Sequence, residues 1–194
     1  MARGTLILVI GPMGSGKSML MNHAIARFPE LVTPYSYTTR ARRPDHVEND
    51  HYKFISVEDF KERIARGEFL EWAEFSGNFY GTLKAEVEEG LKEGKVMFKE
   101  MEVQGVRQAL SVMPKDEVVT IFIEAGSWDE LVRRALSRAP MEADELEKRR
   151  RHHEDELTFM PHADVIIYNR EGEKESAKRA FEEVIEHAIN NVTK

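Results

Sequence analysis

The chain has 194 residues and a formal net charge of −7, with 28 Lys and Arg against 35 Asp and Glu. This length favours one domain, and a composition that is 41% hydrophobic and 32% charged excludes wholesale disorder and fibrous structure. Because there is no cysteine, disulfides, thiolate metal sites and a cysteine nucleophile are excluded. No apolar run approaches a membrane span, and the acidic balance argues against a general nucleic-acid binder, so we expect a cytoplasmic protein.

The chain begins with the pattern strand, glycine turn, helix. An apolar run over 6–10 is bounded by Gly11-Pro12, which is typical of a strand buried on both faces in a parallel sheet. The glycine turn occupies 11–16, and a helix is predicted from Lys17 to about Phe28.

The segment over 34–94 differs from the rest of the chain in its residue pattern. Its short strand patterns are richer in aromatic residues, and between them a helix over 57–66 ends at Gly67. These strand patterns cover 36–39, 51–55 and 69–75. We expect this segment to form a small α+β insertion over the carboxyl ends of the core strands. In the sequence it would separate the two parts of the core, 1–33 and 95–194.

The remaining chain returns to buried strands that are each followed by a helix. The strands are predicted over 96–98, 118–123 and 165–168, and the helices over 104–113, 127–138 and 173–192. Such alternation predicts an α/β fold, with a doubly wound parallel sheet flanked by helices. A charged segment over about 138–157 is predicted to be a helical lid, and the seven histidines are expected to be solvated.

The glycine turn carries a phosphate-binding motif. Gly11-Pro-Met-Gly-Ser-Gly-Lys-Ser18 matches G-x-x-x-x-G-K-[ST] and stands between a strand and a helix, as the motif requires. Glycines let the backbone amides approach a phosphate closely, and the helix N-terminus adds positive potential. Lys17 would reach the β- and γ-phosphates, and Ser18 would bind Mg²⁺. The predicted triphosphate-binding residues are Gly11, Pro12, Met13, Gly14, Ser15, Gly16, Lys17, Ser18 and Met19.

Further motifs follow in a fixed order. They are Ser36-Tyr-Thr-Thr-Arg40-Ala-Arg-Arg43-Pro44, Tyr52, Glu71-Trp-Ala-Glu-Phe-Ser-Gly-Asn-Phe-Tyr80-Gly-Thr82 and Glu102-Val-Gln-Gly-Val106. With the phosphate loop, they resemble the guanylate kinase family over roughly 6–169. The resemblance implies a P-loop nucleoside monophosphate kinase with ATP as co-substrate and Mg²⁺ as cofactor. It would phosphorylate GMP and dGMP in purine nucleotide metabolism, and its partners would be these small nucleotides.

The resemblance also implies how the acceptor is held. Two guanidinium groups and two phenols fall where the family binds the GMP phosphate, and this chemistry suits a phosphate dianion. Those residues are Arg40, Arg43, Tyr52 and Tyr80, and the base readers are Ser36, Glu71 and Thr82. A carboxylate at Glu71 can accept from guanine N1–H and the 2-amino group, which adenine lacks. A solvated basic turn, core tyrosines and an outward-facing glutamate are the structural alternatives.

Other residues are assigned by the same resemblance. The lid arginines Arg134, Arg138 and Arg149 would approach ATP, and Asn169 would contact adenine. The catalytic set is Lys17, Arg40, Arg138 and Arg149.

The motif that begins at Glu100 departs from the family pattern. Glu100 would support Mg²⁺ with Ser18, and Glu102 would contact GMP, although both are one methylene longer than the family aspartates. Lys99 interrupts the apolar run before them, and its amine could lie near the phosphates or at a strand edge.

Three other functions are considered. A kinase with another acceptor, such as ribose 1,5-bisphosphate, would need no guanine readers. A kinase-dead guanylate-kinase-like binding module would need no intact phosphate loop, and nothing supports an ATPase or GTPase switch. The sequence does not indicate an oligomeric state.

Overall fold

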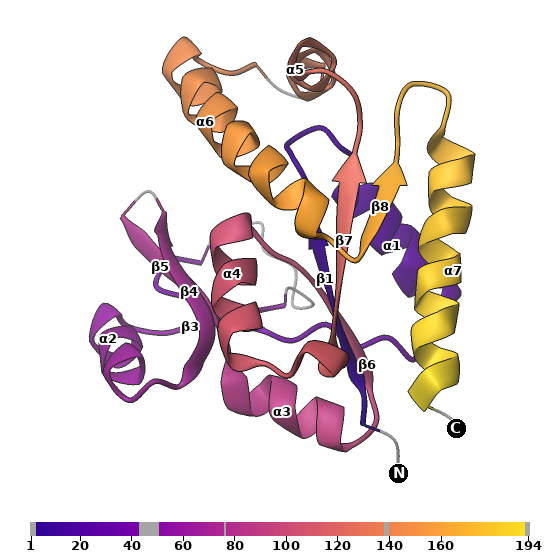
Figure 1. Cartoon of the computed structure of the whole chain (residues 1–194). Helices are drawn as coiled ribbons and strands as arrows, with labels where there is room; N and C mark the ends of the chain where they lie inside the picture. Colours follow the sequence, from indigo (N-terminus) through magenta and orange to yellow (C-terminus); the bar gives the residue numbers. More distant parts are fainter. Residues whose placement is uncertain (1–2, 43–50, 76, 138–139, 193–194) are drawn as a thin grey trace.

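The computed structural model describes residues 3–42, 51–75, 77–137 and 140–192, and its centre is a four-stranded parallel sheet (Figure 1). The strands follow the order β6-β1-β7-β8. Their bounds are Thr5–Ile10 for β1, Val96–Glu100 for β6, Val118–Glu124 for β7 and Val165–Tyr168 for β8. The predicted α/β fold class is therefore confirmed.

Helices cover both faces of this sheet. One face packs against α1 (Lys17–Arg27) and α7 (Lys174–Val192), and the other against α3 (Lys84–Lys92) and α4 (Val103–Val112). Side chains of β1 divide between the two layers, because successive residues of a strand point to opposite faces. Leu6, Leu8 and Ile10 join one hydrophobic cluster, while Ile7 and Val9 join the other.

A second sheet lies beside the first, in the order β3-β2-β5-β4. It consists of β2 (Ser36–Thr38), β3 (Tyr52–Phe54), β4 (Phe69–Phe75) and β5 (Asn78–Leu83), where β2 and β3 are parallel and the other pairs antiparallel. Helix α2 (Val57–Ala65) is capped by the Ser56 hydroxyl, and Gly67 follows it with a φ of 65°. Neither β5 nor α3 is apparent in the sequence pattern.

The remaining elements lie above the carboxyl ends of the core strands or connect them. Helix α5 (Trp128–Leu136) begins with a capping box between Ser127 and Glu130, and α6 (Ala143–Phe159) packs against both α5 and α4. Two short 3₁₀ helices, η1 (Lys115–Glu117) and η2 (Met160–His162), precede β7 and β8. No helix within the described ranges has the length and apolarity needed to cross a bilayer.

The prediction that the histidines are solvated is wrong for His153. Its side chain on α6 is only 8% exposed, and its ring stacks on Trp128 of α5 at a centroid distance of 5.4 Å. His152, the preceding residue, points to another side of the helix and is exposed. A histidine pattern alone does not reveal this contact, because the partner ring belongs to a different helix.

Candidate functional site

The loop between β1 and α1 has the backbone geometry of a phosphate cradle. Gly11, Gly14 and Gly16 all have positive φ values, and Gly16 at 93° is the N-cap of α1. A Cβ atom on Gly16 would lie 2.3 Å from Nδ2 of Asn169. Glycine is therefore required at Gly16 by backbone conformation and by space together.

Asn169, which is distant from this loop in the sequence, hydrogen-bonds to it. It follows β8, is 6% exposed and donates from Nδ2 to the carbonyl oxygen of Ser15 at 2.7 Å. Arg134 of α5 donates in turn to the carbonyl oxygen of Asn169 at 2.9 Å. In this arrangement, two residues expected near the triphosphate also fix the conformation of the phosphate loop.

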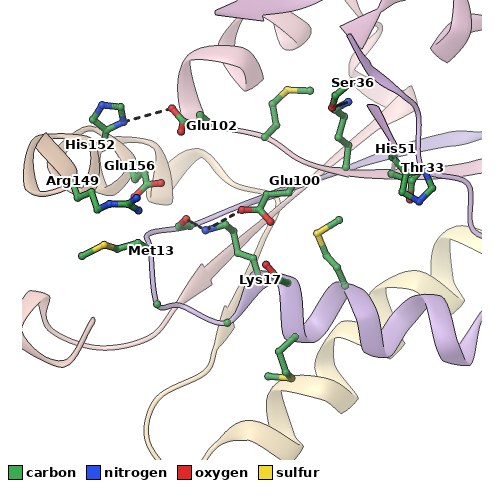
Figure 2. Close-up of a pocket in the computed structure, with 18 of the residues that line it drawn as sticks. Met13, Lys17, Thr33, Ser36, His51, Glu100, Glu102, Arg149, His152 and Glu156 are labelled. Atoms are coloured by element: carbon green, nitrogen blue, oxygen red, sulfur yellow. Dashed lines mark hydrogen bonds and ion pairs between the residues drawn. The ribbon is translucent and has the colours of Figure 1, made fainter. Parts of the chain in front are cut away.

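Lys17 is the first residue of α1, and its side chain points back toward the loop (Figure 2). Its Nζ donates to the carbonyl oxygens of Gly11 and Pro12, the latter at 3.1 Å. The same nitrogen lies 3.4 Å from Oε1 of Glu100, at the end of β6. The Lys17 ammonium and the Glu100 carboxylate thus face each other at the carboxyl edge of the sheet.

The loop opens on a cavity of about 720 Å³ between the core, the second sheet and α6 (Figure 2). Predicted residues that line it are Gly11, Met13, Gly14, Gly16, Lys17, Ser18, Met19, Ser36, Tyr52, Glu100, Glu102 and Arg149. Residues that line it without having been predicted include Thr33, His51, Lys99, Lys148, His152 and Glu156. Arg40, Glu71, Tyr80 and Thr82 lie outside this lining.

Helix α6 presents one face to the cavity. Glu145, Arg149, His152 and Glu156 follow a spacing of three to four residues, so they lie on one side of the helix. Arg149 Nε contacts Glu145 at 2.7 Å, and His152 Nδ1 lies 3.5 Å from Oε2 of Glu102 on the core. The helical spacing is a signal in the sequence that could have identified this face.

Glu156 is the most perturbed acid of that face. Burial raises its pKa to about 7, while the charge of Lys17 acts in the opposite direction and the carboxylates of Glu102, Asp155 and Glu100 raise the value further. A carboxyl group whose pKa is raised by burial therefore shares the cavity with the phosphate loop.

Glu71 lies on β4, outside the lining of the cavity. Its Oε1 accepts a hydrogen bond from the hydroxyl of Thr82 on β5 at 2.5 Å. Burial raises the pKa of Glu71, although the Thr82 bond and the charge of Lys99 oppose the shift. A Cβ atom on Gly105 of α4 would lie 3.1 Å from Oε2 of Glu71, so a larger residue there would crowd that oxygen.

Lys99 joins the two sheets. Its side chain is 7% exposed, and Nζ donates to Ser36 Oγ at 2.8 Å and to the carbonyl oxygens of Tyr35 and Pro34 at 3.3 and 3.4 Å. Burial lowers its pKa to about 8, and the carboxylates of Glu71 and Glu86 oppose this. The amine therefore contacts the start of β2 instead of the phosphate loop.

The remaining acceptor residues lie on the second sheet. The Arg40 guanidinium carbon is 5.5 Å from the ring centroid of Tyr52, which has 36% of its surface exposed. Tyr80 on β5 pairs in register with Thr38 of β2. Arg43 of this predicted set, and Arg138 of the lid set, lie outside the described residues.

A second cavity of about 500 Å³ adjoins the first at the phosphate loop. It shares Gly14, Gly16 and Met19 with the first cavity, and Arg134 and Asn169 line it as well. The additional basic residues in its lining are Arg133, Arg170 and Lys174. Arg170 is already engaged by Glu124, with Nε 2.9 Å from Oε2.

A phosphate loop at the carboxyl edge of a parallel sheet, with two cavities lined by residues of that loop, defines a P-loop nucleotide-binding protein. The family model for guanylate kinase matches residues 3–188, and the chain belongs to the guanylate kinase family.

Individual relatives agree with this assignment. The chain is 41% identical over 186 residues to the guanylate kinase of Rubrobacter xylanophilus, covering 96% of this chain and 94% of that protein. It is 40% identical to the guanylate kinase of Streptomyces coelicolor over 168 residues, covering 87% of this chain and 84% of the relative. The crystal structure of guanylate kinase from Anaplasma phagocytophilum matches with a TM-score of 0.69 at 26% identity, covering 97% of this chain and 88% of that one.

Proposed function

We propose that the chain transfers the γ-phosphoryl group of ATP to GMP or dGMP, giving ADP and the nucleoside diphosphate. The observation that carries this proposal is that one cavity is lined both by the phosphate loop with Lys17 and by Ser36. The Ser36 hydroxyl is bonded to Lys99, whose charge interacts with the carboxylate of Glu71. The phosphate loop and Ser36, one of the three proposed base readers, thus line the same space. Family membership supports the same reaction.

The acceptor base would be read by Glu71, Thr82 and Ser36. With Thr82 bonded to Oε1, the Glu71 carboxylate retains lone pairs that can accept N1–H and the 2-amino group of guanine. Adenine offers neither donor there, so it would leave a buried carboxylate unpaired. Glu102 lines the same cavity and would approach the acceptor nucleotide from the core.

The acceptor phosphate would be bound by Arg40, Arg43, Tyr52 and Tyr80. Arg40 and Tyr52 already lie together, which supports their assignment to one anion site. The reaction needs no covalent intermediate, because catalysis of phosphoryl transfer comes from positioning and charge neutralisation.

The donor ATP would extend from the cavity of Lys17 across the loop to the second cavity. Arg134 and Asn169 would lie at its base end, and the loop residues from Gly11 to Met19 would surround its phosphates. Arg149 lines the reacting cavity, and with Arg138 it would neutralise the transferring phosphoryl group.

The residues at this edge suit Mg²⁺. Ser18 and Glu100 both line the cavity and offer oxygen ligands, which Mg²⁺ prefers, usually with one or two protein carboxylates plus substrate phosphates. No group of three or more His, Asp or Glu side chains suited to a metal occurs in the described part of the chain, so phosphates and water would complete the shell. When bound, the ion would offset charge on the β- and γ-phosphates.

The same proposal assigns roles to parts of the chain. The insertion over 34–94 binds the acceptor, the segment around 138–157 acts as the lid, and the core holds ATP. Closure of both would exclude water and suppress ATP hydrolysis. The cysteine-free composition supports a cytoplasmic location.

The other functions have less support. A kinase for a sugar phosphate would not need the buried Glu71–Thr82 pair, because such an acceptor has no base to recognise. A binding module without kinase activity would not need the intact phosphate loop in which Lys17 faces Glu100.

The test is ADP release from MgATP with GMP, dGMP, AMP, CMP, UMP and ribose 1,5-bisphosphate. Turnover is expected with GMP and dGMP alone, and Lys17→Ala should abolish it. Lys115→Ala is the matched control, because this exposed lysine on η1 precedes β7 and so lies at the opposite edge of the sheet. Turnover confined to another acceptor would refute the proposal.

A further inference from the structure

Lys99 is a buried cation within an apolar strand. The preceding residues of β6, Val96 to Phe98, are all buried hydrophobics, whereas Lys99 buries a primary amine at the start of the second sheet. Its acceptors are two carbonyl oxygens and the Ser36 hydroxyl, at distances of 3.4, 3.3 and 2.8 Å. The shortest of these contacts is the one to a side chain that lines the cavity.

The direction of that hydrogen bond is determined by chemistry. An ammonium group has three protons to donate and no lone pair to accept with, and here three acceptors surround it. Ser36 Oγ must therefore accept from Lys99, which occupies one of its lone pairs. The hydroxyl proton of Ser36 cannot point toward Lys99, so it remains available for a group in the cavity.

We propose that Lys99 is a positioning residue for recognition of the acceptor base: it makes the Ser36 hydroxyl a donor toward the oxygen on C6 of guanine. This inference rests on the proposed function, since it assumes that a guanine nucleotide occupies the cavity beside Ser36. Lys99 itself need not touch the nucleotide.

The arrangement separates guanine from adenine at a second position. Guanine carries an acceptor oxygen on C6, and adenine carries a donor amino group there, so a hydroxyl fixed as a donor favours guanine. Glu71 reads the neighbouring edge with the opposite polarity, because a carboxylate only accepts. The paired donor and acceptor would match guanine and mismatch adenine at both positions.

The first experiment changes Lys99 and the C6 substituent together. Lys99→Met keeps a long unbranched side chain but removes the donor, after which Ser36 can turn its proton to the vacated carbonyl of Tyr35. We expect the KM for GMP to rise about fivefold, the value of a typical hydrogen bond, with kcat within about twofold of the wild type. For 6-thio-GMP, whose sulfur is a poor acceptor, the KM should change less than about twofold.

Two controls separate positioning from structural damage. IMP lacks the 2-amino group but keeps the C6 oxygen, so the ratio of GMP to IMP in kcat/KM reports on Glu71 and should not change in Lys99→Met. Lys99→Arg supplies another donor-only side chain and should restore the preference for GMP over 6-thio-GMP. Lys99→Leu repeats the test with another apolar side chain if Lys99→Met does not fold.

A double-mutant cycle with Ser36→Ala decides whether Lys99 acts through the hydroxyl. Once Ser36 lacks its hydroxyl, Lys99→Met should add less than about twofold to the KM for GMP. Multiplying effects, or equal losses for GMP and 6-thio-GMP, would overturn the inference while leaving the kinase activity in place. If wild-type protein does not phosphorylate GMP at all, the proposed function fails first, and this inference fails with it.

Discussion

The Glu71→Gln substitution tests base recognition most directly. The carboxylate is buried, one oxygen is engaged by Thr82, and Gly105 leaves space beside the other. A glutamine in the same place has one acceptor oxygen and an amino group that would oppose a donor of guanine. Losing one charge-assisted hydrogen bond and weakening a second costs about 3 kcal/mol, or roughly 150-fold in kcat/KM for GMP.

The assay is coupled ADP release with GMP as the varied substrate, and Glu74→Gln is the matched control. Glu74 belongs to the same strand but is exposed, so the same chemical change there should leave kcat/KM within about twofold. An unchanged kcat/KM for GMP in Glu71→Gln would refute the assignment of Glu71 as the guanine reader. Equal losses in both variants would show that the strand, and not the carboxylate, is responsible.

The pH dependence gives an independent check on the same group. Because burial raises the pKa of Glu71, its carboxylate is protonated at a higher pH than an ordinary glutamate as the solution is acidified. A protonated carboxyl cannot accept both guanine donors. On acidification, the KM for GMP should therefore begin to rise at a pH above the range in which an ordinary glutamate titrates. The Glu71→Gln variant should not show this rise.

Further predictions concern the loop, the Glu71 pair and the lid. Gly16→Ala should lower ATP affinity and the free energy of unfolding by more than Gly67→Ala. Both glycines have positive φ, but only at Gly16 would the added Cβ atom also crowd the buried amide of Asn169. Equal losses in calorimetry would contradict this. Thr82→Val removes the hydrogen bond that lowers the pKa of Glu71, so the acid-side rise in KM should move to higher pH, and an unmoved profile would count against it. Burial lowers the pKa of His153, so protonation favours the unfolded chain and stability should fall as pH drops below about 6.5. Denaturant unfolding of His153→Leu should show a weaker pH dependence in that range, and an identical dependence would disprove the cause.

Local sequence patterns predicted the core well because each core strand is recognisable without its neighbours. An apolar run between glycines, as at the end of β1, indicates a buried strand wherever it occurs. The phosphate loop is equally local, since its glycines and Lys17 act within eight residues. These elements lie where the sequence predicted them, within a few residues at their ends.

β5 was missed because its features depend on other strands. Gly81 interrupts the pattern, yet it is required there because a Cβ atom would lie 2.8 Å from both the Phe69 ring and the Glu71 carbonyl oxygen. Gly81, which interrupts the strand pattern in the sequence, therefore lies where two strands approach each other closely.

The contacts of Lys99 and His153 are also not local. Lys99 meets a serine 63 residues away, and His153 stacks on an aromatic ring of another helix. Neither partner follows from periodicity, because the relevant distances exist only once the layers are assembled. Buried polar groups of this kind are where pattern-based reasoning is weakest.

The hydrogen bond between Asn169 and Ser15 joins residues 154 positions apart, and it has a consequence for biosynthesis. The chain is made from its N-terminus, so the phosphate loop leaves the ribosome long before the strand that supports it. β1 also requires β6 and β7 on its two sides before it is fully paired. A nascent chain therefore carries the complete loop sequence long before it carries Asn169, so we expect nucleotide affinity to reach its full value only late in synthesis.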